Sequence, residues 1–132
     1  MNIDWLAVVL GTVAFFVVGA LWYGVLFGKV WQREVGLSNE QLKSGANMPL
    51  IFGLCFLLEF IVVLTLGHMF AFLGSVPDHA KMMIAIGFGL AIMTPATGIN
   101  YLYQRKSLKL FLIDAGHFVV GMAAVGLVFV LL

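Results

Sequence analysis

Four long apolar stretches constrain the fold of this chain more than any other feature of its sequence. They cover residues 5–27, 49–72, 82–103 and 110–132. Each is long enough for a helix that crosses a hydrocarbon core about 30 Å thick, because a helix rises about 1.5 Å per residue. Transmembrane β-strands are only about ten residues long and alternate in polarity, which none of these stretches does. The sequence therefore predicts an all-α integral membrane protein, with residues 1–132 forming a single transmembrane domain that is a bundle of four transmembrane helices.

The composition excludes several other classes of protein. Of the residues, 63% are hydrophobic and 10% are charged, whereas a soluble domain carries about 25% charged residues. Seven Lys and Arg against six Asp and Glu leave no basic excess to neutralise phosphates, so we expect the lipid bilayer as a partner and no nucleic acid. The single cysteine, Cys55, excludes an intramolecular disulfide and a CxxC motif.

The basic residues predict the orientation of the chain. Six of the seven lie in the first and third connections between the stretches: Lys29, Arg33, Lys43, Arg105, Lys106 and Lys109. Because cytoplasmic loops are enriched in Lys and Arg, we expect these connections in the cytoplasm and both termini outside, in the inner (plasma) membrane of the cell. Tyrosine and tryptophan residues near the inner boundary are interpreted as interfacial anchors. A capping box of Ser38 and Gln41 predicts a short interfacial helix near residues 39–44.

Small residues four apart predict close packing between helices, because such residues let two backbones approach each other in lipid. Ala20, Gly24 and Gly28 form such a series at the inner end of the first stretch. We expect a neighbouring helix to pack there, either within the bundle or across a homo-oligomer. The sequence identifies no protein partner.

Three ionisable residues, Glu59, Asp114 and His117, are the candidates for a polar site inside the apolar stretches. Glu59 is near the middle of the second, where a carboxyl group must pair, take up a proton or meet water. Asp114 and His117 are three residues apart and therefore share one face of the fourth helix. With Asn100 of the third helix, they are expected to form a ladder in the cytoplasmic half of the bundle. A carboxylate beside a histidine is typical of a proton relay or cation site, although the same cluster can instead lock the helices in register.

Pro95 predicts a kink in the third helix, next to a polar stripe that includes Thr94 and Thr97. The stripe can line a cavity, or the threonines can cap the carbonyl groups that the kink leaves free. Together these observations predict a cytoplasm-facing polar pocket for a proton or a small ligand. Its expected residues are Glu59, Asp114, His117, Asn100, Thr94 and Thr97.

Three classes of function stay open. The first is a small multi-pass protein with a ligand-binding or accessory role, and the second is a proton- or cation-linked transporter or channel. The third, a membrane-embedded metal enzyme, has only Glu59, Asp114 and His117 as candidate ligands, without the paired carboxylate–histidine sets of di-metal bundles. No GxSxG or Walker motif is present, so we expect no catalytic residue, no metal and no other cofactor.

Several segments resemble a known family. The opening residues 2–8, the run Gly19–Trp31 and the following Gly-Leu-Ser at residues 36–38 are similar to domain-of-unknown-function family 1761. The resemblance covers essentially the whole chain and is most specific at Gly19–Trp31. It implies a small bacterial membrane protein with four helices. It transfers no catalytic residue, because the family has no established activity.

Overall fold

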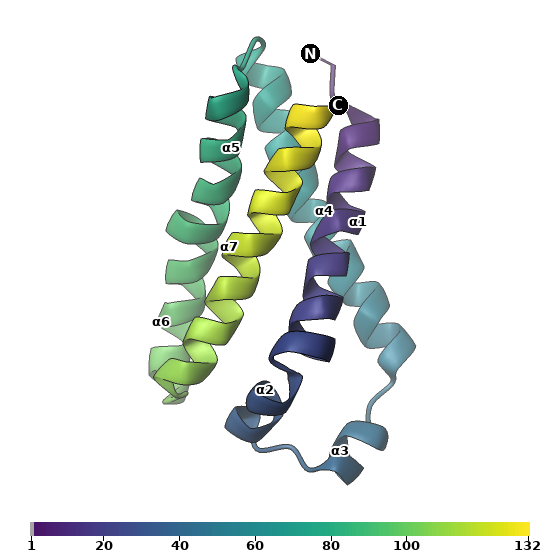
Figure 1. Cartoon of the computed structure of the whole chain (residues 1–132), viewed down its shortest axis with the longest axis vertical. Coiled ribbons are helices and arrows are strands. Elements are labelled where there is room, and N and C mark those ends of the chain that lie inside the picture. Colours follow the sequence, from purple (N-terminus) through teal and green to yellow (C-terminus); the bar gives the residue numbers. More distant parts are fainter. Residues whose placement is uncertain (1) are drawn as a thin grey trace.

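The computed structural model describes residues 2–132, and these contain helices and no β-strand. Four helices are long and apolar enough to cross a membrane. The first is α1 (Trp5–Leu21), continued by a π-helical turn at Trp22–Leu26. The second is α4 (Met48–Leu73), and the third joins α5 (Asp78–Gly87), a π-helical segment (Phe88–Met93) and α6 (Thr94–Gln104). The fourth is α7 (Leu108–Leu131). Two short helices, α2 (Gly28–Val35) and α3 (Asn39–Lys43), connect the first to the second (Figure 1).

Polar side chains cap the N-termini of three of the long helices. Asp4 accepts a hydrogen bond from the Ala7 backbone N–H at 3.0 Å, Asn47 caps α4 and Ser107 caps α7 in the same manner. Such caps satisfy backbone N–H groups that have no partner within the helix. The predicted capping box is confirmed, because Ser38 and Gln41 exchange hydrogen bonds at the start of α3.

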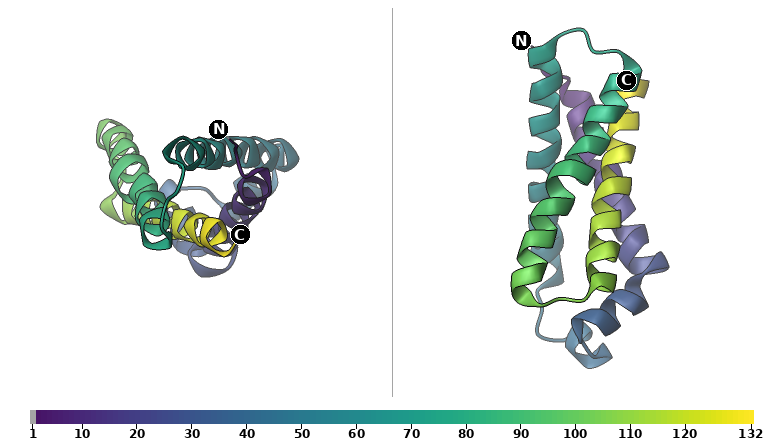
Figure 2. Two further views of the ribbon diagram at one scale, coloured as in Figure 1. Left: turned by 90° about the horizontal axis from the view of Figure 1, so that it is seen from above. Right: turned by 90° about the vertical axis from the view of Figure 1, so that its left-hand side faces the viewer.

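The fourth helix lies at the centre of the bundle. One side of α7 packs against α1, and the other packs against α5, α6 and the π-helical segment between them. The helix α4 packs against α1, and both chain ends lie at the same end of the bundle (Figures 1 and 2). Buried apolar side chains such as Val8, Leu66 and Val125 form the core toward that end. In the opposite half of α4, the rings of Phe52 and Phe56 pair with the ring of Phe16 on α1.

Close packing occurs at glycines other than those expected from the sequence. Ala20 and Gly24 are exposed, and a Cβ added at Gly24 would meet nothing within 4 Å. The alternative that this series packs across a homo-oligomer stays a prediction, but the expected packing within the bundle is wrong for Ala20 and Gly24. The reason is the π-helical turn, which shifts the face of the helix and turns Gly24 outward. Real close contacts occur at positions such as Gly121, where a Cβ would lie 2.7 Å from the Phe15 ring.

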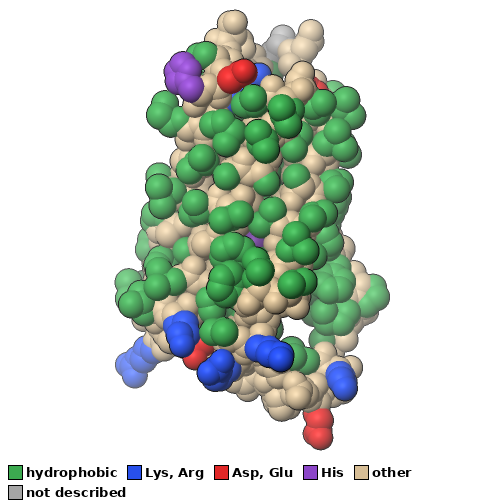
Figure 3. All heavy atoms as spheres, viewed as in Figure 1, with side chains coloured by type: hydrophobic (Ala, Val, Ile, Leu, Met, Phe, Trp, Pro, Cys, Tyr) green, Lys and Arg blue, Asp and Glu red, His purple; other side chains and the backbone are tan. Residues whose placement is uncertain are grey.

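Side chains are segregated along the long axis of the molecule. Figure 3 shows Lys and Arg gathered at the end that holds α2, α3 and the α6–α7 turn, below a broad hydrophobic band. We call this end the basic end. Its two sides are linked, since the Ser107 hydroxyl donates a hydrogen bond to Glu34 of α2 at 2.7 Å.

Candidate functional site

The buried carboxylate of Asp114 joins three helices. Asp114 lies on α7 and only 8% of it is exposed. The hydroxyl of Tyr23, from the π-helical turn after α1, donates a hydrogen bond to Oδ1, and the hydroxyl of Tyr101, from α6, donates one to Oδ2. Both carboxylate oxygens therefore have a donor from a different helix. We call Asp114, Tyr23 and Tyr101 the Asp114 cluster.

The π-helical turn positions Tyr23 for this contact. Within the same turn, the indole N–H of Trp22 donates a hydrogen bond to the backbone carbonyl of Ile113 at 2.9 Å. The indole ring lies over Gly116, where an added Cβ would be 2.9 Å from it. A π-helical turn inserts an extra residue into a helix and is frequently found at functional sites. Here it directs two neighbouring aromatic side chains, Trp22 and Tyr23, at α7.

His117 lies one helical turn beyond Asp114 and is equally buried, with 8% exposed. Its ring packs against Tyr23 and Phe15, with centroids 5.1 Å and 5.5 Å away. Its Nε2 atom is buried and has no hydrogen-bond partner among residues 2–132. Gly19 of α1 leaves the space for this atom, since a Cβ there would lie 3.0 Å from Nε2. His117 therefore lies next to the Asp114 cluster, and its contact with the cluster is the packing of its ring against Tyr23.

Glu59 is not joined to this group. It is half-buried on α4, and its Oε2 atom is buried without a hydrogen-bond partner in the described part of the chain. The helix α4 packs mainly against α1, whereas Asp114 and His117 are on α7. The structure therefore brings Asp114 and His117 together, as their spacing indicates, and leaves Glu59 outside their hydrogen bonds.

The polar residues of α6 do not form the expected lining. Asn100 is exposed, because the next residue, Tyr101, takes the inward position and a helix turns by about 100° per residue. The expectation that Asn100 faces the pocket is therefore wrong. Thr94 and Thr97 donate their hydroxyls to the carbonyls of Gly89 and Met93, at 2.7 Å and 2.8 Å.

These two hydrogen bonds favour one of the two interpretations of the proline kink. The segment Phe88–Met93 before Pro95 is π-helical, so the regular ladder of helical hydrogen bonds is interrupted there. The threonine hydroxyls bond to carbonyls of this segment, and the Gly89 carbonyl also accepts the Thr94 backbone N–H. Both threonine hydroxyls are thus bonded within their own helix, which disfavours threonines directed into a cavity.

A groove at the basic end borders the Asp114 cluster at Tyr101. It has a volume of about 360 Å³, and Tyr101 lines it together with Lys106, Ser107 and Phe111. Tyr101 thus has one side on an open groove and its hydroxyl on a buried carboxylate. A carboxylate held by phenol hydroxyls can take up and pass on a proton. In residues 2–132, no group of three His, Cys, Asp or Glu is placed to hold a metal ion.

Sequence reasoning missed the two tyrosines of the cluster. Both lie near the predicted inner boundary, where tyrosine is an ordinary interfacial anchor. Tyr101 does share the stripe of Thr94 and Thr97 on α6, and that spacing is the signal that could have identified it. No comparable spacing indicates Tyr23, because its direction depends on the π-helical turn.

The fold and the site define an all-helical protein with four helices long enough to cross a membrane and a buried carboxylate cluster between three of them. The chain matches the model of the family described as protein of unknown function (DUF1761) over residues 6–130, and it belongs to that family. The family expected from the sequence is thereby confirmed. No curated protein and no solved structure matches the chain.

Proposed function

We propose that the chain is a multi-pass protein of the bacterial inner (plasma) membrane, with the basic end in the cytoplasm and both termini outside. Four long apolar helices and the hydrophobic band support the membrane location. Six of seven basic residues belong to the basic end, which supports the orientation. Labelling with an impermeant thiol reagent tests it, since in a Cys55→Ser background Ser75→Cys should react from outside intact cells and Ser38→Cys should not. The reverse pattern would refute the orientation.

Within this framework, we propose that the Asp114 cluster is a proton relay that opens to the cytoplasm and serves a proton-linked small transporter or channel. The observation that carries the proposal is the double role of Tyr101, which lines a groove at the basic end and donates its hydroxyl to Asp114. Asp114 takes the proton of the Tyr101 hydroxyl while that hydroxyl regains one from the groove. Beyond Asp114 the proton would have to pass to Tyr23, which is hydrogen-bonded to Oδ1, and then to His117, whose ring packs against Tyr23 without a hydrogen bond to it.

The second candidate is a purely structural role for the same residues, in a protein with an accessory function. The observation that favours it is that both oxygens of Asp114 have tyrosine donors from other helices, so that the cluster clamps α1, α6 and α7 together. Buried hydrogen-bonded carboxylates can fix the register of packed helices. The two candidates predict the same loss of stability on mutation but different effects on proton movement.

Proton movement is measured in proteoliposomes that contain a pH-sensitive dye, after a step in external pH. The proton relay requires faster equilibration than in protein-free vesicles, and Asp114→Asn should return the rate to that of protein-free vesicles. Asp78→Asn is the matched control, because Asp78 is exposed in the first turn of α5, far from the cluster. Tyr101→Phe, which keeps the ring, should also slow the flux. Wild-type protein without flux, or unchanged flux in a folded Asp114→Asn protein, would refute the relay and favour the clamp.

A further inference from the structure

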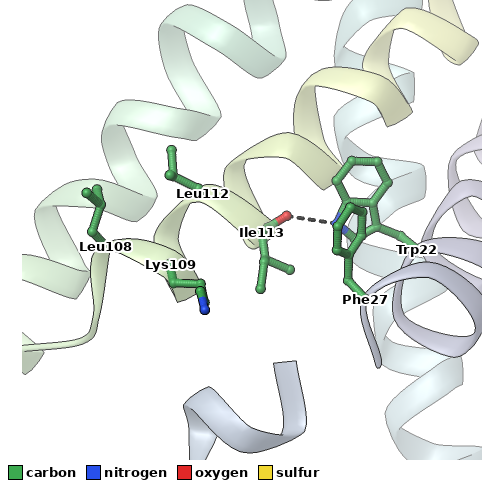
Figure 4. Close-up of a pocket in the computed structure, with 6 residues that line it drawn as sticks. All are labelled: Trp22, Phe27, Leu108, Lys109, Leu112 and Ile113. Atoms are coloured by element: carbon green, nitrogen blue, oxygen red, sulfur yellow. Dashed lines mark hydrogen bonds between the residues drawn. The ribbon is translucent and has the colours of Figure 1, made fainter. Parts of the chain in front are cut away.

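A second groove at the basic end shares Leu108 with the one beside Tyr101 and has Trp22 and Phe27 as its aromatic wall. It has a volume of about 340 Å³ and lies between the π-helical turn after α1 and the first turns of α7. Its walls are mostly apolar, and Lys109 is the one charged residue among those that line it (Figure 4). Its residues are Trp22, Phe27, Leu108, Lys109, Leu112 and Ile113.

The aromatic wall of this groove is held in place. The Trp22 indole N–H is already bonded to the Ile113 carbonyl, and the ring packs against Phe27 with centroids 4.7 Å apart. Gly116 leaves room for the indole ring on α7. Since the indole N–H is occupied, the Lys109 ammonium is the remaining side-chain donor of the groove. A ligand would therefore be recognised by an apolar body and one negative charge.

We infer that this groove binds an anionic phospholipid, with the phosphodiester on the Lys109 ammonium and the start of an acyl chain between Trp22 and Leu112. The charge of the surroundings supports this occupant, because five further basic residues belong to the same end of the molecule. Basic sites between helices on the cytoplasmic side of a membrane are suited to anionic lipid head groups. The inference rests on the proposed membrane location and orientation and is independent of the proton relay.

Trp22 provides a direct probe of the groove. Trp5→Phe and Trp31→Phe leave it as the single tryptophan of the chain. The protein is reconstituted in phosphatidylcholine bilayers in which a fixed fraction of either phosphatidylglycerol or phosphatidylcholine carries brominated chains, and quenching of Trp22 fluorescence is measured. One lysine near the surface contributes enough to favour brominated phosphatidylglycerol about five-fold in relative association constant.

The contribution of Lys109 is separated from that of general surface charge by matched variants. Lys109→Gln should abolish the preference, and Lys109→Arg should keep it. Lys43→Gln removes the same charge from exposed α3, outside the groove, and should also keep it. Equal quenching by the two lipids in the parent protein, or equal loss in Lys109→Gln and Lys43→Gln, would overturn the lipid site. Absence of quenching by either lipid would overturn the membrane location on which the site depends.

Discussion

Removing the Tyr101 hydroxyl tests the central contact of the candidate site. Tyr101→Phe keeps the aromatic ring and deletes the donor to Asp114 Oδ2. A hydrogen bond to a charged group is worth about 1.5–3 kcal/mol, and we expect the free energy of unfolding to fall by about that amount. The matched control is Tyr103→Phe, because Tyr103 is 87% exposed. It should change the free energy of unfolding by no more than about 0.5 kcal/mol.

A double-mutant cycle then shows whether the effect of Tyr101 passes through Asp114. In an Asp114→Asn background the acceptor is neutral, and a neutral hydrogen bond is worth only about 0.5–1.5 kcal/mol. We therefore expect Tyr101→Phe to cost about 1–2 kcal/mol less there than in the parent protein, a coupling typical of residues in contact.

Unfolding is followed by circular dichroism and tryptophan fluorescence as SDS is added to the protein in mixed detergent micelles. Comparing four proteins, the parent, the two single variants and the double variant, cancels the cost of Asp114→Asn itself. The reasoning is refuted if Tyr101→Phe is no more destabilising than Tyr103→Phe, or if its cost is the same with Asp114 and with asparagine at that position.

The same unfolding assay checks three further expectations. A Cβ at Gly89 would lie 2.7 Å from the backbone oxygen of Phe118. Gly89→Ala should thus cost about 1–3 kcal/mol through overpacking, while Gly87→Ala, which meets nothing within 4 Å, should not destabilise; equal effects would contradict this helix contact. Gly24→Leu should stay within about 0.5 kcal/mol of the parent, because that position faces open space, and a large loss would restore the close-packing prediction. Glu59→Gln should shift stability by less than about 1 kcal/mol, since Oε2 has no hydrogen bond to lose within residues 2–132; a larger loss would indicate that Glu59 is paired.

Local sequence was sufficient for the four long helices and for several of their ends. Helix length follows from the extent of each apolar stretch, and the cap at the start of α3 follows from Ser38 and Gln41, three residues apart. Asp114 and His117 also share a face simply because they lie three residues apart on one helix. All of these properties depend on interactions within a few residues of the chain.

Tertiary structure decided which faces of the helices meet. The long helices are apolar around most of their circumference, so hydrophobic periodicity does not indicate the buried side. Tyr23 and Asp114 are 91 residues apart in the chain, and they meet because the π-helical turn rotates Tyr23 toward α7 and Gly24 away from it. Asn100 and Tyr101 are neighbours in the chain, but Asn100 is exposed and Tyr101 faces α7. The packing of α6 on α7 decides which of the two faces inward. The sequence by itself determined where helices form, while the contacts between helices determined which polar side chains share the buried site, because each partner of Asp114 comes from another helix.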